Sequence, residues 1–304
     1  MIHYSKCPVC ASEAVHEQLK AVDHTVSRET FAVWHCNSCS LRFTQDIPAA
    51  DAIGPYYASD AYVSHSDTKE GLVNSLYHRV RKITLQAKRK LVARSTGISK
   101  GRILDIGCGT GAFLAAMQKA GWEITGLEPD ATARAKALEL YRIEAAEPAE
   151  LDRLPAGSFD AITMWHVLEH VHELHHYADQ LARLLRPHGK IFIAVPNYTS
   201  YDAGLYKENW AAYDVPRHLY HFSPASMEKL LRLYGFKLLR CKPMWFDSIY
   251  VSMLSEQYKN GKSSFISACW NGFISNLNAI GNPKKCSSVI YVVEKEGALL
   301  TDHG

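Results

Sequence analysis

A glycine-rich loop is the first place in this 304-residue sequence where residue types and spacing point to ligand binding. Residues 105–111 read DIGCGTG, after an apolar run and before a helical pattern. Glycines let the backbone turn tightly and come close to a ligand, and the start of a helix offers unpaired N–H groups. Glu128 follows 23 residues after Asp105, at the end of the next apolar run. A carboxylate there can accept both hydroxyl protons of a ribose.

Two classes of ligand are compatible with this loop. Gly107, Gly109 and Ala112 fit the G-x-G-x-x-G/A pattern of dinucleotide-binding proteins, so NAD is one. Asp105 precedes the glycines, however, where its charge attracts a cation such as a methionyl ammonium and repels a pyrophosphate. The loop therefore favours a ligand that combines a positive charge with a ribose.

Histidines gather after two of the predicted strands. His166, Glu169 and His170 have the i, i+3, i+4 spacing that places side chains on one face of a helix. His221 lies in PRHLYHFS at residues 216–223, after the next strand. Both loops are expected at the carboxyl ends of parallel strands, where ligands bind in open sheets.

These side chains leave three roles open. His166 or His221 can act as a general base, since an imidazole pKa near 6.5 suits proton transfer at neutral pH. A divalent ion bound by His166, Glu169, His170 and His221 can instead lower the pKa of a substrate hydroxyl. In the third role, Glu169 and His170 only brace the loop.

Four cysteines form two C-x-x-C pairs that are separated by 25 residues: Cys7, Cys10, Cys36 and Cys39. Each pair can place two thiolates on one tetrahedral ion, and four thiolates leave no position open, as in structural Zn²⁺ sites. A redox-active pair, or iron in place of zinc, is the alternative. Two matched pairs in a segment too small for its own apolar core favour zinc.

Strand and helix patterns alternate from Gly101 onward, and these elements must position the glycine loop and the two histidine-containing loops. Apolar runs predict buried strands at residues 103–106, 124–127, 159–165, 190–195, 236–240 and 289–294. Helical patterns lie at residues 112–120, 131–141 and 173–186. A further helix follows Ser223, with Pro224 in its first turn and Glu228 available to the cap. This alternation predicts an α/β fold with a parallel sheet.

Residues 101–240 resemble the class I S-adenosylmethionine (SAM)-dependent methyltransferases. The resemblance is carried by the D-x-G-x-G-x-G loop, GLEPD at 126–130, SFDAITMWHVLEHV at 158–171, LLRPHGK at 184–190 and VPN at 195–197. The family's P-G-G turn is PHG here, a surface change. The resemblance implies a Rossmann-like, seven-stranded, mostly parallel sheet with helices on both faces, preceded by the small zinc-ribbon segment.

The resemblance also assigns the parts of the SAM site. The loop would hold the methionine portion, the acid after the second strand the ribose, and the segment near Glu147 the adenine. The residues expected to bind SAM are Asp105, Gly107, Cys108, Gly109, Gly111, Glu128, Pro129, Glu147 and Trp165. The divalent-ion alternative is similar to the small-RNA 2′-O-methyltransferases (E-V-x-E-H, then H-x-F), although His166 stands where they have the first acid.

We expect three parts in the chain: a zinc-ribbon-like segment at 1–45, a connector with lid helices at 46–100, and the SAM-binding domain at 101–304. Within the last part, residues 241–288 form an aromatic helical insert that can cover substrate, contact a second copy or lie on a membrane surface. The aromatic side chains that can close over the cofactor, or simply pack, are Tyr56, Tyr57, Tyr62 and His65.

Charge and hydropathy limit the partners. Lys plus Arg (34) barely exceeds Asp plus Glu (31), which does not indicate a nucleic-acid partner. A basic stretch at 78–94 can dock a polyanion or form a solvated helix face. The N-terminus lacks the apolar core of a signal peptide and no run reaches the ~18 apolar residues of a membrane span, so we expect a cytoplasmic protein.

The expected activity is methyl transfer from SAM to a small molecule, most simply to a hydroxyl of a sugar, lipid or quinone-like metabolite. The alternatives are an RNA 2′-O-methyltransferase that uses the basic stretch, and an inert zinc-binding interaction module. A homodimer is compatible with the aromatic insert.

Overall fold

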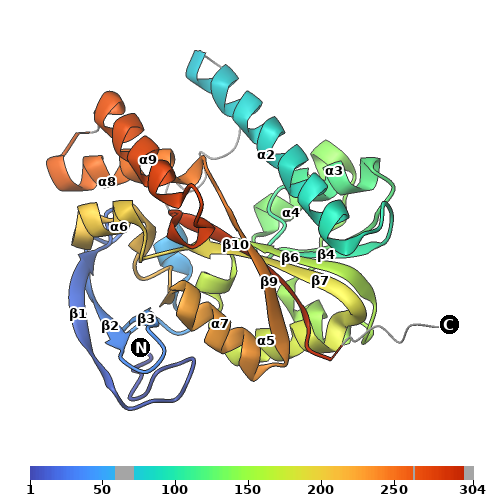
Figure 1. Cartoon of the computed structure of the whole chain (residues 1–304), viewed down its shortest axis with the longest axis horizontal. Helices are drawn as coiled ribbons and strands as arrows, with labels where there is room; N and C mark the ends of the chain where they lie inside the picture. The colour runs from blue at the N-terminus through green and yellow to red at the C-terminus, as the bar shows by residue number, and fades with distance from the viewer. Residues whose placement is uncertain (59–71, 263, 298–304) are drawn as a thin grey trace.

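A six-stranded sheet forms the centre of the computed structural model, which describes residues 1–58, 72–262 and 264–297 (Figure 1). Its strand order is β5-β4-β6-β7-β10-β9. The strands are β4 (Arg102–Ile106), β5 (Glu123–Leu127), β6 (Phe159–Trp165), β7 (Leu185–Pro196), β9 (Phe236–Pro243) and β10 (Ser288–Lys295). The first four are mutually parallel, and β10 is antiparallel to both β7 and β9. The Rossmann-like α/β class expected from the sequence is confirmed.

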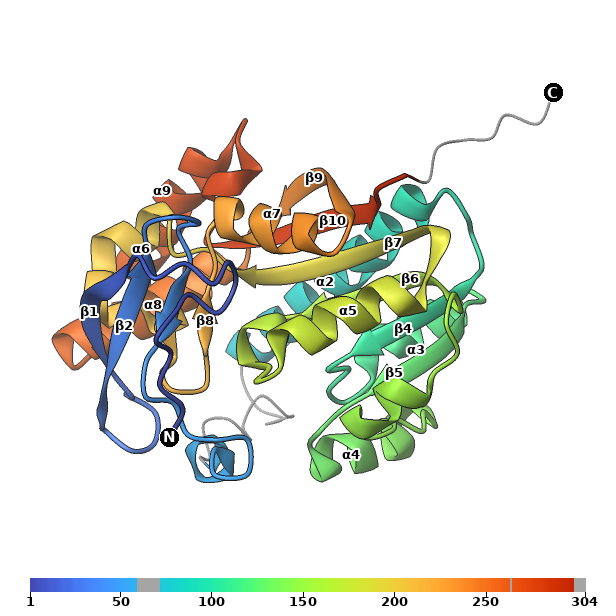
Figure 2. The same ribbon diagram turned by 90° about the horizontal axis from the view of Figure 1, so that it is seen from below.

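Helices cover both faces of this sheet because successive strand residues point to opposite sides. Ile103 packs with the helices α2 (Leu72–Thr96), α3 (Ala112–Lys119) and α4 (Ala131–Tyr141). Leu104, the next residue, packs on the other face with α5 (Leu174–Leu184) and α7 (Pro224–Leu233). Figure 2 shows the two helical layers with the sheet between them.

The expected seventh strand is absent from the described part of the sheet. Beyond β5 a single bridge joins Leu127 to Ala146. Pro148 has no N–H to donate to a ladder, and it starts the 3-10 helix η2 (Pro148–Arg153) two residues later. The pairing therefore ends after one residue, and the central sheet has six strands.

The cap of α7 also differs from the sequence-based expectation. Ser223 caps the helix as expected, but its partner in the capping box is Ser226. Glu228 instead binds Arg232 one turn later, with 2.8 Å between carboxylate oxygen and guanidinium nitrogen. Ser226 is the N3 residue, and Glu228 lies two positions beyond it.

A second, antiparallel sheet combines the two halves of the chain. Its strands, in order, are β1 (Val15–Val22), β2 (Thr30–Cys36), β3 (Arg42–Thr44) and β8 (Tyr220–His221). In the β3–β8 pairing, Arg42 lies opposite His221 and Phe43 opposite Tyr220. The N-terminal hairpin is thus joined to the loop after β7.

The remaining helices lie mainly beside this second sheet. They are α6 (Tyr201–Tyr206), α8 (Asp247–Asn260), α9 (Phe265–Ala279) and the 3-10 helices η1 (Gly54–Tyr57), η3 (Leu168–His170), η4 (Lys207–Asn209), η5 (Ala211–Tyr213) and η6 (Pro283–Lys285). In Figure 1, α8 and α9 form a helical pair at the upper left. Within the described ranges, every helix is too short or too polar to cross a lipid bilayer.

Candidate functional site

The glycine loop follows β4 with a backbone that glycine permits. Gly107, Gly109 and Gly111 have φ of 70°, 54° and 78°, in the left-handed region. A Cβ atom on Gly107 would lie 2.3 Å from Cγ2 of Val167. The loop after β6 therefore approaches the glycine loop so closely that a side chain at this position would collide with it.

Two buried carboxyl groups flank the loop. Asp105, at the end of β4, accepts a hydrogen bond from the Thr163 hydroxyl, and burial raises its pKa to about 7. Glu128 accepts hydrogen bonds from the backbone N–H of Gly109 (2.8 Å) and Asp130 (3.0 Å). Burial raises the pKa of Glu128 as well. The structure thus brings Asp105, the loop and Glu128 to one edge of the sheet.

Arg134 joins the residues expected at the ribose and adenine. Its guanidinium donates to the backbone carbonyls of Glu128 and Pro129, each at 2.8 Å, and to the Glu147 carboxylate at 2.8 Å. Glu147 precedes η2. Cys108 in the loop is buried, which raises its pKa to about 12 and makes it a neutral packing group. Arg134 belongs to an ordinary helical pattern, so the sequence around it gives no sign of this role.

Lys88 from α2 also reaches this site. Its ammonium lies 4.3 Å from the centre of the Trp165 ring, which packs edge-on against Phe113. Burial lowers the pKa of Lys88, whereas the charges of Asp247 and Asp105 act in the opposite direction. The Trp165 indole N–H is buried and has no partner among the described residues. Lys88 is therefore part of the site, although its basic run suggested a solvated face.

His166 lies between two carboxylates. Its Nε2 is 2.9 Å from Asp247 at the start of α8, and its Nδ1 is 3.2 Å from Glu169. Burial disfavours the imidazolium, but the two acids outweigh this effect and raise the His166 pKa to about 10. Its φ of 58° is a conformation that side-chain-bearing residues adopt at a cost of roughly 1–2 kcal/mol. The two ion pairs stabilise this strained position, and the side chain remains 33% exposed.

His221 has different surroundings from His166. It lies in β8, is almost fully buried, and its Nε2 is 3.1 Å from the Thr44 hydroxyl oxygen. That hydroxyl donates its own proton to the carbonyl of His218, so His221 is the donor to Thr44. Burial holds the pKa of His221 well below its usual range, so the imidazole is neutral.

A second group of ligand atoms lies beside these histidines. One atom each from Glu169, His170 and His218 lies within 4.8 Å of the others. The Nδ1 atoms of His170 and His218 face the carbonyls of Arg217 (3.0 Å) and Ala212 (2.8 Å). A carbonyl only accepts, so each Nδ1 carries a proton, and Nε2 is the ring nitrogen that is left for a metal ion; in His218 that nitrogen also lies 3.9 Å from the Asp214 carboxylate. The Oε2 atom of Glu169 is buried and has no partner in the described part of the chain.

This group contains two of the four residues that were expected to bind a divalent ion. Glu169 and His170 lie together, but the third member is His218. His166 is not in the group, because residues 168–170 form the short 3-10 helix η3, in which the i, i+4 geometry of an α-helix does not apply.

Two of the four expected lid residues fall within the described ranges. The Tyr57 hydroxyl is 3.1 Å from Nδ1 of His170, and the Tyr56 hydroxyl donates to Glu29 in the loop before β2 at 2.7 Å. Tyr62 and His65 lie outside the described residues. The Tyr57 contact places the end of η1 beside the histidines.

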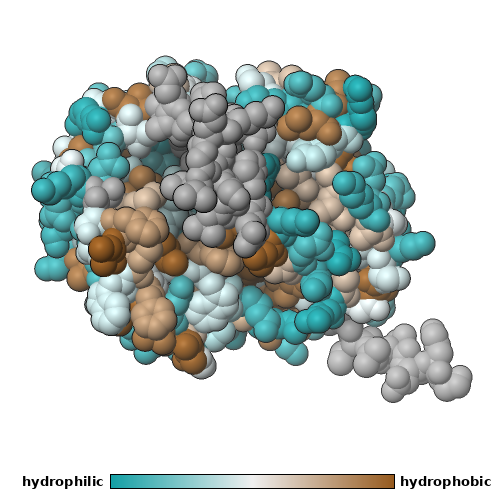
Figure 3. Space-filling model, turned by 90° about the horizontal axis from the view of Figure 1, so that it is seen from above, coloured by the Kyte–Doolittle hydropathy of each residue, from teal (hydrophilic) through white to brown (hydrophobic). Residues whose placement is uncertain are grey.

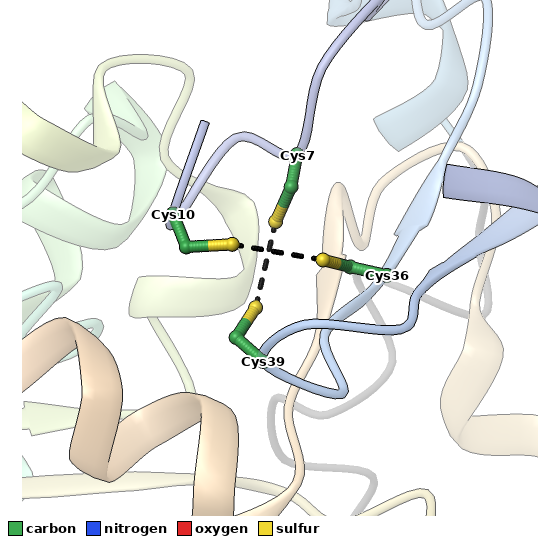
Figure 4. Close-up of side chains that lie close together, drawn as sticks. All are labelled: Cys7, Cys10, Cys36 and Cys39. Atoms are coloured by element: carbon green, nitrogen blue, oxygen red, sulfur yellow. Dashed lines mark hydrogen bonds between the residues drawn. The ribbon is translucent and has the colours of Figure 1, made fainter. Parts of the chain in front are cut away.

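The four N-terminal cysteines converge on one point (Figure 4). The sulfur atoms are 3.5 Å apart between Cys7 and Cys39 and 3.6 Å apart between Cys10 and Cys36. A disulfide bond would require ~2.0 Å, whereas thiolates bound at ~2.3 Å to a tetrahedral Zn²⁺ lie about 3.8 Å apart. The arrangement therefore fits four ligands around one ion.

Comparisons with known proteins agree with the geometry of the central sheet and its glycine loop. The family described as "Methyltransferase domain" matches residues 77–240, which is 164 of the 304 residues. A ubiquinone biosynthesis O-methyltransferase from Xanthomonas axonopodis pv. citri is 31% identical over 48% of this chain and 66% of that protein. A protein of the same name from Nitrosococcus oceani is 31% identical over 53% of this chain and 72% of its own length.

Solved structures show the same fold at low sequence identity. Magnesium protoporphyrin IX methyltransferase from Synechocystis PCC 6803, with bound S-adenosylhomocysteine, has a TM-score of 0.50 and 15% identity over 79% of this chain and 96% of that one. A sarcosine dimethylglycine methyltransferase described from Galdieria sulphuraria has a TM-score of 0.50 and 16% identity over 69% of this chain and 86% of that one.

We expect the Glu128→Ala variant to bind SAM about 30- to 900-fold more weakly than the unmodified chain. The substitution removes a carboxylate that can accept two charge-assisted hydrogen bonds from the ribose, a loss of roughly 2–4 kcal/mol. Isothermal titration calorimetry measures the affinity. Glu123→Ala on the same strand is the matched control, since the Glu123 side chain is 68% exposed. Unchanged SAM affinity in Glu128→Ala, together with binding of NAD, would contradict the assignment.

Proposed function

This chain belongs to the class I SAM-dependent methyltransferases, and on that basis we propose that it transfers the methyl group of SAM to a hydroxyl of a small molecule. The O-methyltransferase names of the curated relatives support this reaction class. The acceptor that fits those names is a quinone-like metabolite, with a lipid or a sugar as the broader class.

The residues at the glycine loop fit SAM. The Gly107 backbone leaves no space for a Cβ atom, and the carboxyl groups of Asp105 and Glu128 flank the loop. When bound, SAM supplies a methyl group already activated by its sulfonium. The chain's main contribution is then to hold the acceptor oxygen in line with that methyl group.

The observation that carries the proposal is the partly exposed His166 beside the glycine loop, held by Asp247 and Glu169. Because Asp247 and Glu169 accept both imidazole protons, His166 and these two acids together carry a net negative charge and can take up the proton of a neighbouring hydroxyl, which favours its nucleophilic, ionised form. His166 thus has a catalytic role toward the acceptor oxygen, and Asp247 positions the imidazole. Buried in β8 and hydrogen-bonded to Thr44, His221 contributes mainly to the shape of the site.

We expect His166→Ala to lower kcat by about 10²–10⁴-fold while SAM affinity changes less than about threefold. The reason is that His166 acts on the acceptor and not on the donor. Turnover with a catechol or hydroquinone acceptor, followed by formation of S-adenosylhomocysteine, measures kcat. His176→Ala serves as the control, because His176 pairs with Asp152 on the surface of α5. Full activity in His166→Ala would show that the residue is structural.

We also propose that the four cysteines hold a structural Zn²⁺ ion. The support is the convergence of four sulfur atoms, because a metal bound there can supply folding free energy to the small segment that the cysteines join. All four ligand positions belong to the protein, so this ion would stabilise the β1–β2 sheet and take no part in methyl transfer.

Purified protein should contain about one zinc per chain by elemental analysis, and the quadruple Ser variant of Cys7, Cys10, Cys36 and Cys39 should contain none. Replacement of Cys241 and Cys269, which lie outside the cluster, should leave the zinc content unchanged. Zinc retained in the quadruple variant would place the metal elsewhere, and protein without stoichiometric metal would reject the site.

A second ion is proposed for Glu169, His170 and His218. Two imidazole nitrogens and a carboxylate oxygen that has no partner among the described residues are the ligand types that bind divalent ions, and the carbonyls behind both rings hold their orientation. Burial and the neighbouring His218 lower the pKa of His170 to about 4, which keeps its ring neutral. Such an ion would lower the pKa of an acceptor hydroxyl.

We expect zinc-loaded protein to bind one Mn²⁺ ion, with an affinity that falls at least about tenfold in Glu169→Gln. Electron paramagnetic resonance of free Mn²⁺ measures this without any turnover assay. Asp247→Asn is the matched control, because Asp247 contacts His166 and none of the three ligands. Equal Mn²⁺ binding by Glu169→Gln and wild type would refute the site.

A further inference from the structure

Helix α9 directs its large apolar side chains away from the protein. Ile266, Trp270, Phe273, Leu277 and Ile280 recur at spacings of four, three, four and three residues, which is one stripe along a helix that continues onto the residue after it. These side chains are between 43% and 82% exposed. An ordinary surface helix shows the opposite pattern, with its large apolar residues toward the core.

The inward stripe of α9 consists of small residues. Ala268, Gly272, Ser275 and Ala279 are all buried. At Gly272 a Cβ atom would lie 2.7 Å from Cα of Ile249 in α8, so the two helices pack backbone to backbone. Each small residue lies two positions after a large one, or about 200° around the helix. The packing of α8 on α9 is therefore complete without the large side chains.

The start of α8 extends the same apolar surface. The Trp245 carbonyl accepts a hydrogen bond from the Asn276 side chain of α9 at 2.8 Å. Trp245, Phe246 and Tyr250 are each more than 40% exposed. In Figure 3, brown and tan side chains gather at the lower left, on the side where Figure 1 shows α8 and α9. We call this surface, formed by the three aromatic residues and the α9 stripe, the aromatic face.

Lysines lie at both ends of the aromatic face. Residues 257–293 contain no Asp or Glu. Their four lysines are all exposed, in two pairs at the two ends of α9: Lys259, Lys262, Lys284 and Lys285. An apolar, Trp-containing helix face with lysines at both ends matches the interfacial layer of a bilayer with anionic lipids, although Lys284 also lies 3.9 Å from the Glu228 carboxylate of α7.

We propose that the aromatic face binds the surface of an anionic lipid bilayer, with α9 lying in the plane of the interface. Its large side chains would enter the boundary between headgroups and acyl chains, and the lysines would contact the headgroup phosphates. A second copy of this chain fits less well, because a two-fold interface centred on α9 would bring its lysine pairs toward each other, and residues 257–293 supply no acid to balance them.

This surface begins next to the candidate active site. Phe246 precedes Asp247, the carboxylate that binds His166. A membrane-dissolved acceptor would therefore approach His166 along α8 without crossing bulk water. This consequence for the acceptor rests on the proposed function, whereas the bilayer binding does not, so the two can fail separately.

Sedimentation of the full chain with vesicles tests the proposal without SAM or acceptor. Binding should be strong to vesicles of phosphatidylcholine with phosphatidylglycerol and weak to phosphatidylcholine alone. Lys284→Gln with Lys285→Gln should weaken the binding about fivefold per lysine, because one basic residue near a charged surface contributes about 1 kcal/mol. Trp270→Ser with Phe273→Ser should weaken it at least about tenfold to both kinds of vesicle.

Leu138→Ser with Leu140→Ser is the matched control, since these two leucines are similarly exposed on α4. Circular dichroism checks that every variant folds. The proposal is overturned if anionic vesicles do not sediment the wild type, or if the aromatic and control variants bind equally well. Analytical ultracentrifugation that shows a dimer lost in Trp270→Ser with Phe273→Ser, without vesicle binding by the wild type, would assign the face to a second copy.

Discussion

The buried guanidinium of Arg217 holds together the parts of this molecule that the sequence separates. It donates to Asp23 after β1, to Asp214 in its own loop and to the Tyr56 carbonyl at the end of η1. Burial alone would raise the Asp23 pKa, but Arg217 and backbone N–H groups hold it well below its usual range. A charge without solvent must keep its partners, so the N-terminal sheet, the connector and the site loop have one mutual arrangement.

The same residue links this arrangement to the chemistry. The Arg217 carbonyl accepts a hydrogen bond from the Nδ1–H of His170, and the next residue along the chain is His218. The proton on Nδ1 of His170 is therefore set by the backbone carbonyl of the residue whose side chain makes these ion pairs. His166 is fixed from the other side, by the first residue of α8. The candidate site thus combines the loop after β7, the start of α8 and the edge of the central sheet that carries the glycine loop.

Local patterns were sufficient to predict the elements that carry the glycine loop and the acid that follows it. Apolar runs gave six strand positions, and the spacing of Asp105, the glycines and Glu128 depends on a single strand–turn–helix–strand unit. Asp247 could not be found in this way, because 81 residues separate it from His166 and nothing near it in sequence indicates a role. Lys88 is one of seven basic residues in its stretch, and the sequence does not distinguish it from the other six. His218 lies three residues before His221, and the sequence does not show which of the two lies beside Glu169 and His170. Pro148 ends the pairing beyond β5 after one residue, so no seventh strand forms there. The sequence could not show this, because the effect of Pro148 depends on how closely the chain runs beside β5.

The pairing of β3 with β8 has a consequence for how the chain folds during synthesis. The partner of Arg42 is residue 221, so the ribosome must add almost 180 residues before the N-terminal sheet can gain its last strand. Until then Leu41 and Phe43, both fully enclosed in the finished protein, remain open to solvent on a nascent hairpin. Such long-range closure slows folding and favours a single late transition over domain-by-domain maturation. The N-terminal sheet is therefore synthesised early but gains its last strand, β8, only late in synthesis.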